Sequence, residues 1–350
     1  MKLLIITQKI NKNDPILGFF HGWIREFSKH FDSIVGICLE KGEYDLPTNV
    51  KVLSLGKEEI SKKSEVQSAK FLKQLKYVVR FWSYIWRERK NYDAVFVHMN
   101  PVYVVLGGLI WYIIRKPIFL WYTHKSVDLK LRVAEKFVNK VFSASKESFR
   151  LPSNKLEIFG HGIDTDLFSP LQNSNAKSNK IISVGRISKS KNQLLMVEAV
   201  HKLIDQYSDI VLTIVGDSIT KEDHEYKKEI EVKVKELGLK DHVFLVGAIN
   251  PKDVIHYYQD SDLFINLSST GSMDKAVLEA MSCGNKILTS NEAFRQILPP
   301  ENRTDNNVEN ISNGIMRLLD APVDSRLREF VVVNHQLRAL IRNLSGEIRK

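Results

Sequence analysis

The chain has 350 residues, of which 43% are hydrophobic and 26% are charged, and its formal net charge is +10. This length is too great for a typical single core and predicts two domains, and the composition excludes a largely disordered chain. The positive charge indicates an anionic partner, and nucleic acid, a phosphorylated substrate or acidic lipid would each satisfy it.

Segments that could mark secretion, a membrane span or a metal site are not expected. The opening MKLLIITQKI has only a short apolar run before Gln8 and Lys9, so it predicts a buried strand and not a signal peptide. The apolar run at residues 102–114 is shorter than the ~18–20 residues that cross a bilayer, and it predicts a buried or interfacial helix. Cys38 and Cys283 are far apart in sequence, which argues against a disulfide framework or a cysteine metal site and fits a reducing cytoplasm.

Strand-like runs alternate with longer amphipathic segments along the chain. The first series is KLLIIT, SIVGIC, VKVLSL, DAVFVHM, PIFLWYTH and KVFSAS, and the second is KIISVG, IVLTIVG, HVFLVG, DLFINL and NKILTS. This alternation predicts an α/β protein with parallel sheets flanked by helices. The polar, aperiodic LQNSNAKSNK between the two series predicts a linker. We therefore expect a first domain at 1–171, a linker at 172–179, a second domain at 180–325, and a C-terminal helix at 326–350 that could pack back on the first domain.

An amphipathic helix with a basic side is predicted at residues 70–90. We expect its apolar face to be core and its opposite face to carry Lys73, Lys76, Arg80 and Arg87. That basic face is either solvated or attracted to anionic lipid headgroups, which would make the protein peripheral on the inner face of the plasma membrane. The predicted apolar face comprises Leu72, Leu75, Val78, Val79, Trp82, Ile85 and Trp86.

Two strand ends in the second series have the chemistry of anion sites. In SVGRISKSKNQLLMVEAV a strand ends at Gly185 and a helix begins near Asn192, so Arg186 and Lys191 lie between them. The stretch STGSMDKAVLEAMSCGNKILTS likewise places small residues before a helix. Two anion sites on one sheet predict a bound diphosphate, although a solvated basic loop would also explain the first of them.

Lys275 and Glu279 lie together on that second helix, opposite its apolar side. They are either a solvated ion pair four residues apart, worth only ~0.2–0.5 kcal/mol, or part of the anion site.

These motifs, taken in order, resemble those of the retaining, nucleotide-sugar-dependent glycosyltransferases of family 4, the glycosyl transferases group 1. VGRISKSKN is similar to the family's diphosphate-binding Gly-Arg-x(4)-Lys motif, and VLEAMSCGNKIL is similar to its LEAMACGxPV signature. GHGIDTDLFSP, IVGDS and HVFLVGAIN resemble further blocks of the family. The resemblance covers nearly the whole chain and implies the GT-B fold, in which two tandem Rossmann-like, doubly wound domains face each other across a cleft.

The resemblance also implies roles for individual residues of the second domain. Arg186 and Lys191 would grip the donor's diphosphate, and Glu279 would hydrogen-bond the donor's ribose. The backbone near Ala248 and Ile249 would meet the nucleobase.

One position departs from the family pattern. The family usually has a second glutamate where this chain has Gly271, so Ser272, Met273 and Asp274 are expected to contact the sugar hydroxyls and the leaving phosphate, with Lys275 beside them. Two alternatives stay open: the catalytic site is degraded, or Asp274 is only a helix cap.

In the first domain the resemblance implicates His124, which follows a predicted strand and would lie beside the donor sugar. Gly18 lies in the first strand-to-helix connection, where the family has glycines that let the acceptor and donor approach closely. His98 ends the preceding strand, and for this side chain a structural role is the better interpretation.

The implied reaction moves a sugar from a nucleoside-diphosphate sugar to a hydroxyl of a lipid-linked or saccharide acceptor, with retention of anomeric configuration. This is the activity of a hexosyltransferase in cell-envelope glycan, polysaccharide or glycolipid synthesis, and it requires no cofactor or metal ion if protein cations stabilise the diphosphate. The alternatives are a nucleotide-sugar epimerase of the same fold and a noncatalytic nucleotide-sugar-binding relative. Nucleic-acid binding is not expected, because no recognition motif accompanies the basic residues.

Overall fold

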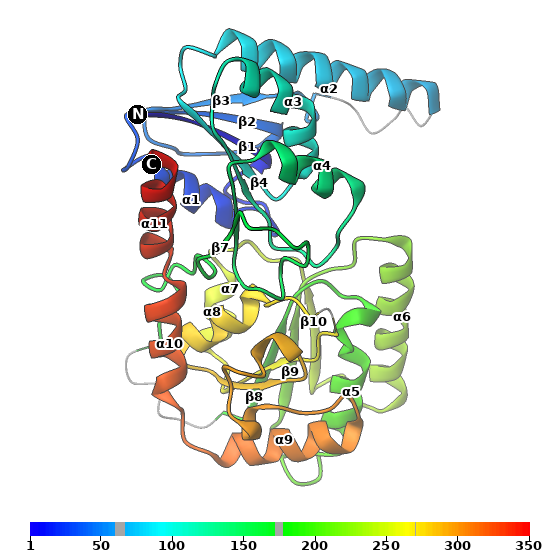
Figure 1. The fold of residues 1–350 in the computed structure, drawn as a ribbon. Helices are drawn as coiled ribbons and strands as arrows, with labels where there is room; N and C mark the ends of the chain where they lie inside the picture. The colour runs from blue at the N-terminus through cyan, green and yellow to red at the C-terminus, as the bar shows by residue number, and fades with distance from the viewer. Residues whose placement is uncertain (60–66, 172–177, 270) are drawn as a thin grey trace. The chain divides into compact units, whose positions relative to one another are not determined.

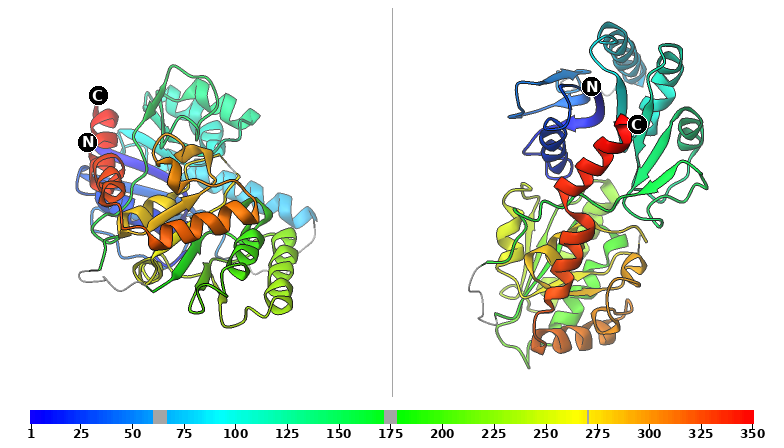
Figure 2. Two further views of the ribbon diagram at one scale, coloured as in Figure 1. Left: turned by 90° about the horizontal axis from the view of Figure 1, so that it is seen from below. Right: turned by 60° about the vertical axis from the view of Figure 1, so that its left-hand side comes forward.

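The structure, a computed structural model, describes residues 1–59, 67–171, 178–269 and 271–350, and the side chains of its second helix from residue 72 onward. The chain divides into two compact units (Figures 1 and 2). The first unit comprises residues 1–162 and 337–350, and the second unit comprises residues 163–336. The predicted linker at 172–179 falls largely outside the described residues.

A parallel sheet of seven strands forms the centre of the first unit, in the order β3-β2-β1-β4-β5-β6-β7. Six of its strands, β1 to β6, correspond to the first series of apolar runs, which contain many of the β-branched and aromatic residues that favour extended backbone. The strands are β1 (Lys2–Ile10), β2 (Ser33–Lys41), β3 (Val50–Ser54), β4 (Ala94–His98), β5 (Ile118–Trp121), β6 (Lys140–Ser143) and β7 (Leu156–Ile158).

Helices cover both faces of this sheet. One face packs against α1 (Phe19–Phe27) and α11 (Leu337–Arg349), whose Trp23 and Leu340 are buried in the same apolar cluster. The other face packs against α2 (Gln67–Arg87), α3 (Pro101–Ile113) and α4 (Leu129–Phe137). Because both faces are covered, the central strands β1 and β4 are apolar on both sides.

The second unit has a five-stranded parallel sheet in the order β10-β9-β8-β11-β12. Its strands are β8 (Lys180–Val184), β9 (Val211–Val215), β10 (Val243–Gly247), β11 (Leu263–Asn266) and β12 (Lys286–Thr289). One face is covered by α5 (Gln193–His201), α6 (Lys221–Glu236) and α9 (Val308–Asp320), and the other by α7 (Val254–Gln259), α8 (Lys275–Cys283) and α10 (Ser325–His335).

Each of the eleven runs predicted as strands corresponds to a strand of one of the two sheets. The prediction missed only β7 among the described strands, an edge element of three residues that is too short for a strand period to be recognised. Two doubly wound parallel sheets with flanking helices are therefore the architecture, as the alternation predicts.

The unit boundaries differ from the predicted domain boundaries. Residues 163–171 group with the second unit because Ile163 and Phe168 are buried in its core, and the Ile163 backbone N–H donates to the His335 carbonyl at 2.7 Å. The single helix predicted at 326–350 is two helices, α10 and α11, separated at Gln336, whose backbone is extended. The first helix packs against α8 and the second against α1, so they belong to different units.

Helix α2 is oriented differently from the prediction. The core of the first unit takes Phe81 and Ile85, with Tyr77 and Tyr84 packed beside them. The stripe expected to be core is largely exposed instead, because α2 has apolar side chains on two of its faces and the sheet contacts the more aromatic one. The exposed members are Leu72, Leu75, Val79, Trp82 and Trp86.

Within the part of the chain that the structure describes, we find no helix with the length and apolar character needed to cross a membrane.

Candidate functional site

The order of strands in the second sheet indicates where a ligand would bind. The chain starts this sheet at β8, adds β9 and β10 on one side, and then adds β11 and β12 on the other. In such sheets ligands bind beyond the carboxyl ends of the strands where the winding reverses, which here means beyond β8 and β11. The loops at these two strand ends contain Arg186 and Lys191 in one case and residues 267–274 in the other.

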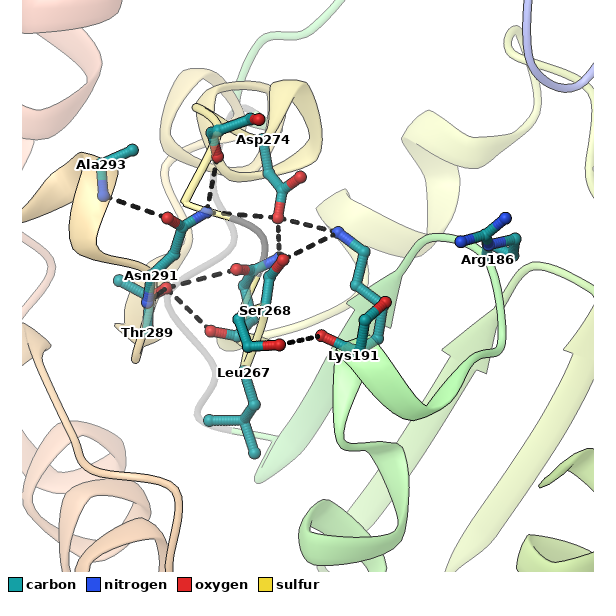
Figure 3. A network of polar contacts seen from close by, with 12 residues as sticks. Arg186, Lys191, Leu267, Ser268, Asp274, Thr289, Asn291 and Ala293 are labelled. Atoms are coloured by element: carbon teal, nitrogen blue, oxygen red, sulfur yellow. Dashed lines mark hydrogen bonds and ion pairs between the residues drawn. The ribbon is translucent and has the colours of Figure 1, made fainter. Parts of the chain in front are cut away.

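A polar network centred on Asp274 joins these two loops (Figure 3). The Lys191 ammonium donates to Oδ2 of Asp274 at 2.8 Å and to Oγ of Ser268 at 3.3 Å. The same Oδ2 accepts from the side-chain amides of Asn266 at 2.9 Å and Asn291 at 3.4 Å. Lys191 and Asp274 are each 19% exposed, so the ion pair is largely shielded from solvent.

Asp274 occupies the N-cap position of α8, but its side chain makes no capping hydrogen bond. The carboxylate instead points to Lys191, as Figure 3 shows. The cap therefore does not explain why an acidic side chain is at this position.

Further bonds hold the two loops against each other. The Ser269 backbone N–H donates to the Ser190 carbonyl at 3.0 Å, and the Asn192 side chain donates to the Leu267 carbonyl at 2.8 Å. Asn192 adopts the left-handed conformation with a φ of 53°, which an asparagine tolerates better than most residues. The Asn291 side chain also donates to the Ser272 carbonyl at 2.8 Å. The polar ends of three strands are thus held as one framework.

Close backbone packing under this framework requires glycine. Gly185 has a φ of 150° and Gly216 a φ of 135°, both in the region that favours glycine. A Cβ added to Gly216 would lie 1.9 Å from the carbonyl oxygen of Gly185. The loop that carries Arg186 therefore keeps its path only while residue 216 lacks a side chain.

Arg186 stands apart from the Asp274 network. Its side chain is 47% exposed, and its Nε lies 3.9 Å from Oδ2 of Asp223. Figure 3 shows Arg186 away from the Asp274 network, with no bond to it. A weakly paired, half-exposed guanidinium can bind an anion without first losing a strong partner.

Glu279 lies one turn into α8 and uses both of its carboxylate oxygens. Oε1 accepts from the Lys275 ammonium at 2.5 Å, and Oε2 accepts from the Tyr258 hydroxyl at 3.1 Å. Burial, and then the Glu279 charge, raise the pKa of Tyr258 well above its usual value, so this phenol remains a donor. The i,i+4 ion pair is therefore present, and each oxygen keeps a second lone pair for a further donor.

The remaining predicted donor-binding residues lie around the same end of the sheet. Ala248 and Ile249 directly follow β10. Gly271 has a φ of 66°, and Ser272 is partly exposed. Met273 is buried in the apolar cluster that includes α8, so its side chain is a core residue and only its backbone could reach a ligand.

Two predicted residues belong to the first unit. His124 is exposed in the loop after β5, where its Nδ1 accepts from the Ser126 backbone N–H at 3.1 Å. Gly18 is the N-cap of α1 with an ordinary helical φ of −58°, so the backbone does not require a glycine there.

His98 is a buried packing residue, as its position predicts. Its ring stacks on Phe20 with the ring centroids 3.8 Å apart, and its Nδ1 lies 3.2 Å from the Thr7 hydroxyl. Burial lowers the pKa of His98 to about 3, so the imidazole is neutral near pH 7.

The sequence analysis missed Asn266, Ser268 and Asn291, which hold Asp274 and Lys191 in place. Each directly ends or follows a predicted strand, in DLFINL or NKILTS, and polar residues at those positions were the available signal. Among the described residues no group of three or more His, Cys, Asp or Glu side chains is arranged to hold a metal ion.

Comparison with known proteins identifies the second unit. Residues 164–330 match the family model for glycosyl transferases group 1. These residues form a glycosyl transferases group 1 domain. The matched range contains Arg186, Lys191 and the whole Asp274 network, so the candidate site lies inside the glycosyltransferase domain.

Two curated relatives are glycosyltransferases by name. The UDP-Gal:alpha-D-GlcNAc-diphosphoundecaprenol alpha-1,3-galactosyltransferase of Escherichia coli is 25% identical over 290 residues, which is 72% of each chain. The N-acetylgalactosamine-N,N'-diacetylbacillosaminyl-diphospho-undecaprenol 4-alpha-N-acetylgalactosaminyltransferase of Campylobacter jejuni is 27% identical over 139 residues, 39% of this chain and 35% of that relative.

The solved structure of Anabaena Alr3699/HepE in complex with UDP and glucose superposes over the full length of both chains. Its TM-score is 0.75 and its sequence identity is 16%, so this likeness concerns the fold. The glycosyltransferase domain is thus part of a chain with the GT-B fold.

Proposed function

We propose that this chain is a retaining hexosyltransferase that moves a sugar from a nucleoside-diphosphate sugar to a hydroxyl acceptor. The observation that carries the proposal is the pair of joined loops beyond β8 and β11 within a group 1 glycosyltransferase domain. There Lys191 pairs with Asp274 at the N-cap of α8, and the half-exposed Arg186 lies on the same loop as Lys191. Guanidinium, ammonium and helix N-terminus are the groups that favour a diphosphate.

In this proposal Lys191 binds the diphosphate without releasing Asp274. An ammonium has three N–H donors, and two of them are directed at Asp274 and Ser268. The third is left for a phosphate oxygen, and Arg186 supplies a second cation. As the glycosidic bond to phosphate breaks, negative charge grows on the diphosphate, and both cations then bind it more strongly. Protein cations are therefore expected to take the place of a metal ion or cofactor.

Glu279 has the role of anchoring the nucleoside. Its carboxylate is fixed by Lys275 and Tyr258, and a remaining lone pair would accept from a ribose hydroxyl. The backbone at Ala248 and Ile249, directly after β10, would meet the base. Asp274, with Ser272 beside it, would contact the sugar in place of the family glutamate that Gly271 replaces.

We assign no carboxylate of the Asp274 network as a nucleophile. We therefore propose that the acceptor hydroxyl attacks from the front face of the donor sugar, assisted by the leaving phosphate. This route keeps the anomeric configuration. His124 is assigned to the sugar from the family resemblance alone, as a hydrogen-bond donor.

The names of relatives narrow the substrates. The Escherichia coli relative is named for a UDP-galactose donor and a diphosphoundecaprenol-linked acceptor, and the Anabaena structure was solved with UDP and glucose. We therefore propose a uridine diphosphate hexose as donor and a lipid-linked or saccharide acceptor in cell-envelope glycan synthesis, with the reaction in the cytoplasm.

A panel of UDP-, GDP- and ADP-hexoses tests this proposal. Binding is measured by calorimetry, slow hydrolysis by release of nucleoside diphosphate, and transfer by the appearance of a glycosylated polyprenyl diphosphate whose anomeric configuration is assigned by NMR. Lys191→Ala should lose donor binding, and Lys228→Ala, an exposed lysine on α6, should not. No binding of any donor, or a product of inverted configuration, would contradict the proposal.

A second candidate is a noncatalytic nucleotide-sugar-binding protein. The ion pair between Asp274 and Lys191 and the loss of the family glutamate at Gly271 favour it. Selective donor binding with neither hydrolysis nor transfer to any acceptor would support this candidate over the transferase.

A further inference from the structure

The first unit presents an apolar surface that its core does not use. On α2 the exposed side chains are Leu72, Leu75, Val79, Trp82 and Trp86, spaced at three or four residues along one side of the helix. On α3 they are Val105, Leu109, Tyr112 and Ile113, in which Leu109 lies four residues after Val105 and Tyr112 and Ile113 lie three and four residues after Leu109. Their exposed fractions run from 38% to 77%, whereas large apolar side chains in a soluble monomer are normally exposed singly.

The two stripes form one surface, which we name the α2–α3 face. Both helices cover the same side of the first sheet and contact each other. The Trp82 indole N–H donates to the Leu106 carbonyl of α3 at 2.9 Å, which places this exposed ring at the junction of the stripes. In Figure 1 the N-terminal turns of α2 also extend past the strands of the sheet.

The two helices of the α2–α3 face carry charges of one sign only. Neither α2 nor α3 contains an acidic residue. Lys76 is exposed beside the α2 stripe, Lys90 is exposed just beyond the end of α2, and Arg115 is exposed just beyond the end of α3. Leu72, Leu75 and Val79 share an open groove with Lys76 and Arg80, so apolar and cationic groups line the same hollow.

Two of the basic residues predicted to attract lipid headgroups are already paired within the first unit. Arg80 donates to the Leu55 carbonyl at 2.9 Å and lies 3.3 Å from Glu59. Arg87 lies 3.3 Å from the Glu88 carboxylate and stacks on Tyr84. These two arginines mainly stabilise the first unit, and the surface charge is carried by other basic side chains.

We propose that the α2–α3 face docks onto the surface of an anionic lipid bilayer. A surface of leucine, tryptophan and tyrosine bordered by lysine and arginine matches the boundary between acyl chains and phosphate headgroups. Lysine is depleted at protein–protein interfaces, whereas the exposed Lys76 and Lys90 border this apolar surface. The predicted attraction of α2 to lipid is thus assigned to an apolar stripe with a cationic border, and the exposed residues of α3 extend that stripe. This inference does not depend on the proposed transferase activity.

Co-sedimentation of the full chain with vesicles tests the proposal. The expected result is binding to vesicles of phosphatidylcholine with phosphatidylglycerol, much weaker binding to phosphatidylcholine alone, and weakening of the first by salt. Lys76→Ala with Lys90→Ala should reduce binding by roughly 25-fold, at about fivefold for each basic residue. Lys228→Ala with Lys235→Ala, two exposed lysines of α6, is the matched control for charge.

The apolar part of the surface has its own pair of variants. Leu109→Gln with Ile113→Gln should reduce binding by tenfold or more at every salt concentration, because insertion of apolar side chains is not screened. Val232→Gln with Val333→Gln changes two similarly exposed residues of the second unit and should leave binding unchanged. Since all four positions are exposed, the variants should keep the melting temperature and the donor hydrolysis of the unmodified chain.

Three outcomes would overturn the proposal. They are no sedimentation with anionic vesicles, equal binding to neutral and anionic vesicles, and equal effects of the α2–α3 variants and their controls. A concentration-dependent dimer in analytical ultracentrifugation that Leu109→Gln with Ile113→Gln dissociates would assign the face to a second copy of the chain. Absence of donor hydrolysis by the unmodified chain, by contrast, would count against the transferase proposal and would not bear on the proposal that the α2–α3 face binds lipid.

Discussion

Replacing Asp274 by asparagine should strengthen the binding of UDP. Asp274 holds the Lys191 ammonium at 2.8 Å, and this anion repels an incoming diphosphate. Asparagine keeps the shape of the side chain and is as good a residue at a helix N-cap. The variant therefore removes one negative charge while changing the packing of α8 little.

The size of the effect follows from the geometry of the ammonium. Two oxygens that accept from one tetrahedral ammonium at 2.8 Å are about 4.6 Å apart, and two unit charges at that separation repel by about 0.9 kcal/mol in water and about 3.6 kcal/mol at an effective dielectric of 20. Since Lys191 and Asp274 are each 19% exposed, the site lies between these limits. A value of about 2 kcal/mol corresponds to roughly 30-fold tighter binding of UDP.

The assay is calorimetric titration of UDP into Asp274→Asn and into the unmodified chain at two salt concentrations. Asp260→Asn, which removes the partner of Lys180 at 2.9 Å on the same unit, is the control and should leave the affinity unchanged. Transfer by Asp274→Asn should nevertheless be slower if this carboxylate contacts the donor sugar. Unchanged or weaker binding of UDP by Asp274→Asn would refute the reasoning that Asp274 opposes the diphosphate.

Three further predictions concern the site and the stability of the two units. Arg186→Ala should weaken UDP binding by roughly 10- to 100-fold in calorimetry, because it removes a charge-assisted hydrogen bond worth about 1.5–3 kcal/mol. An unchanged affinity for UDP would show that Arg186 does not belong to the binding site. Gly216→Ala should lower the free energy of unfolding by about 3 kcal/mol in urea denaturation, because the new Cβ would overlap the backbone before Arg186. The control is Gly238→Ala, at a position with a positive φ but open space, which should lower the free energy of unfolding by about 1 kcal/mol. Equal losses in the two variants would contradict the overlap. Burial lowers the pKa of His98 from 6.5 to about 3, so the contribution of the neutral imidazole to the free energy of unfolding is complete above pH 6.5 and falls by about 1.4 kcal/mol per pH unit below it. His98→Gln should therefore flatten the pH dependence of the free energy of unfolding between pH 6 and 4 by about that slope. An unaltered slope would contradict the assignment of His98 as a buried neutral residue.

The sequence predicts the two sheets well because their strands carry dense apolar runs between helical segments. KIISVG and DLFINL, for instance, are β8 and β11, and the polar residues that follow them lie at the expected end of the sheet. The pairing of Lys191 with Asp274 was not predictable in the same way. It depends on two loops 83 residues apart and on Asn291, which the prediction did not consider.

Helix α2 shows why periodicity alone can select the wrong face. Its apolar side chains extend around most of the helix, and a helical wheel cannot tell which side the sheet contacts. Phe81 and Ile85 are buried, and Trp82 and Trp86, one position further along, are exposed. Likewise, the final helices read as one segment because the break at Gln336 involves neither glycine nor proline.

The central claim is that Arg186 and Lys191 bind the second phosphate of a nucleotide donor, and a comparison of UDP with UMP tests it most directly. Affinities of both nucleotides are measured by calorimetry for the unmodified chain and for Arg186→Ala with Lys191→Ala. The account predicts that the unmodified chain prefers UDP and that the double variant binds the two nucleotides nearly equally. A double variant that retains the full preference for UDP, or an unmodified chain that binds neither nucleotide, would contradict it.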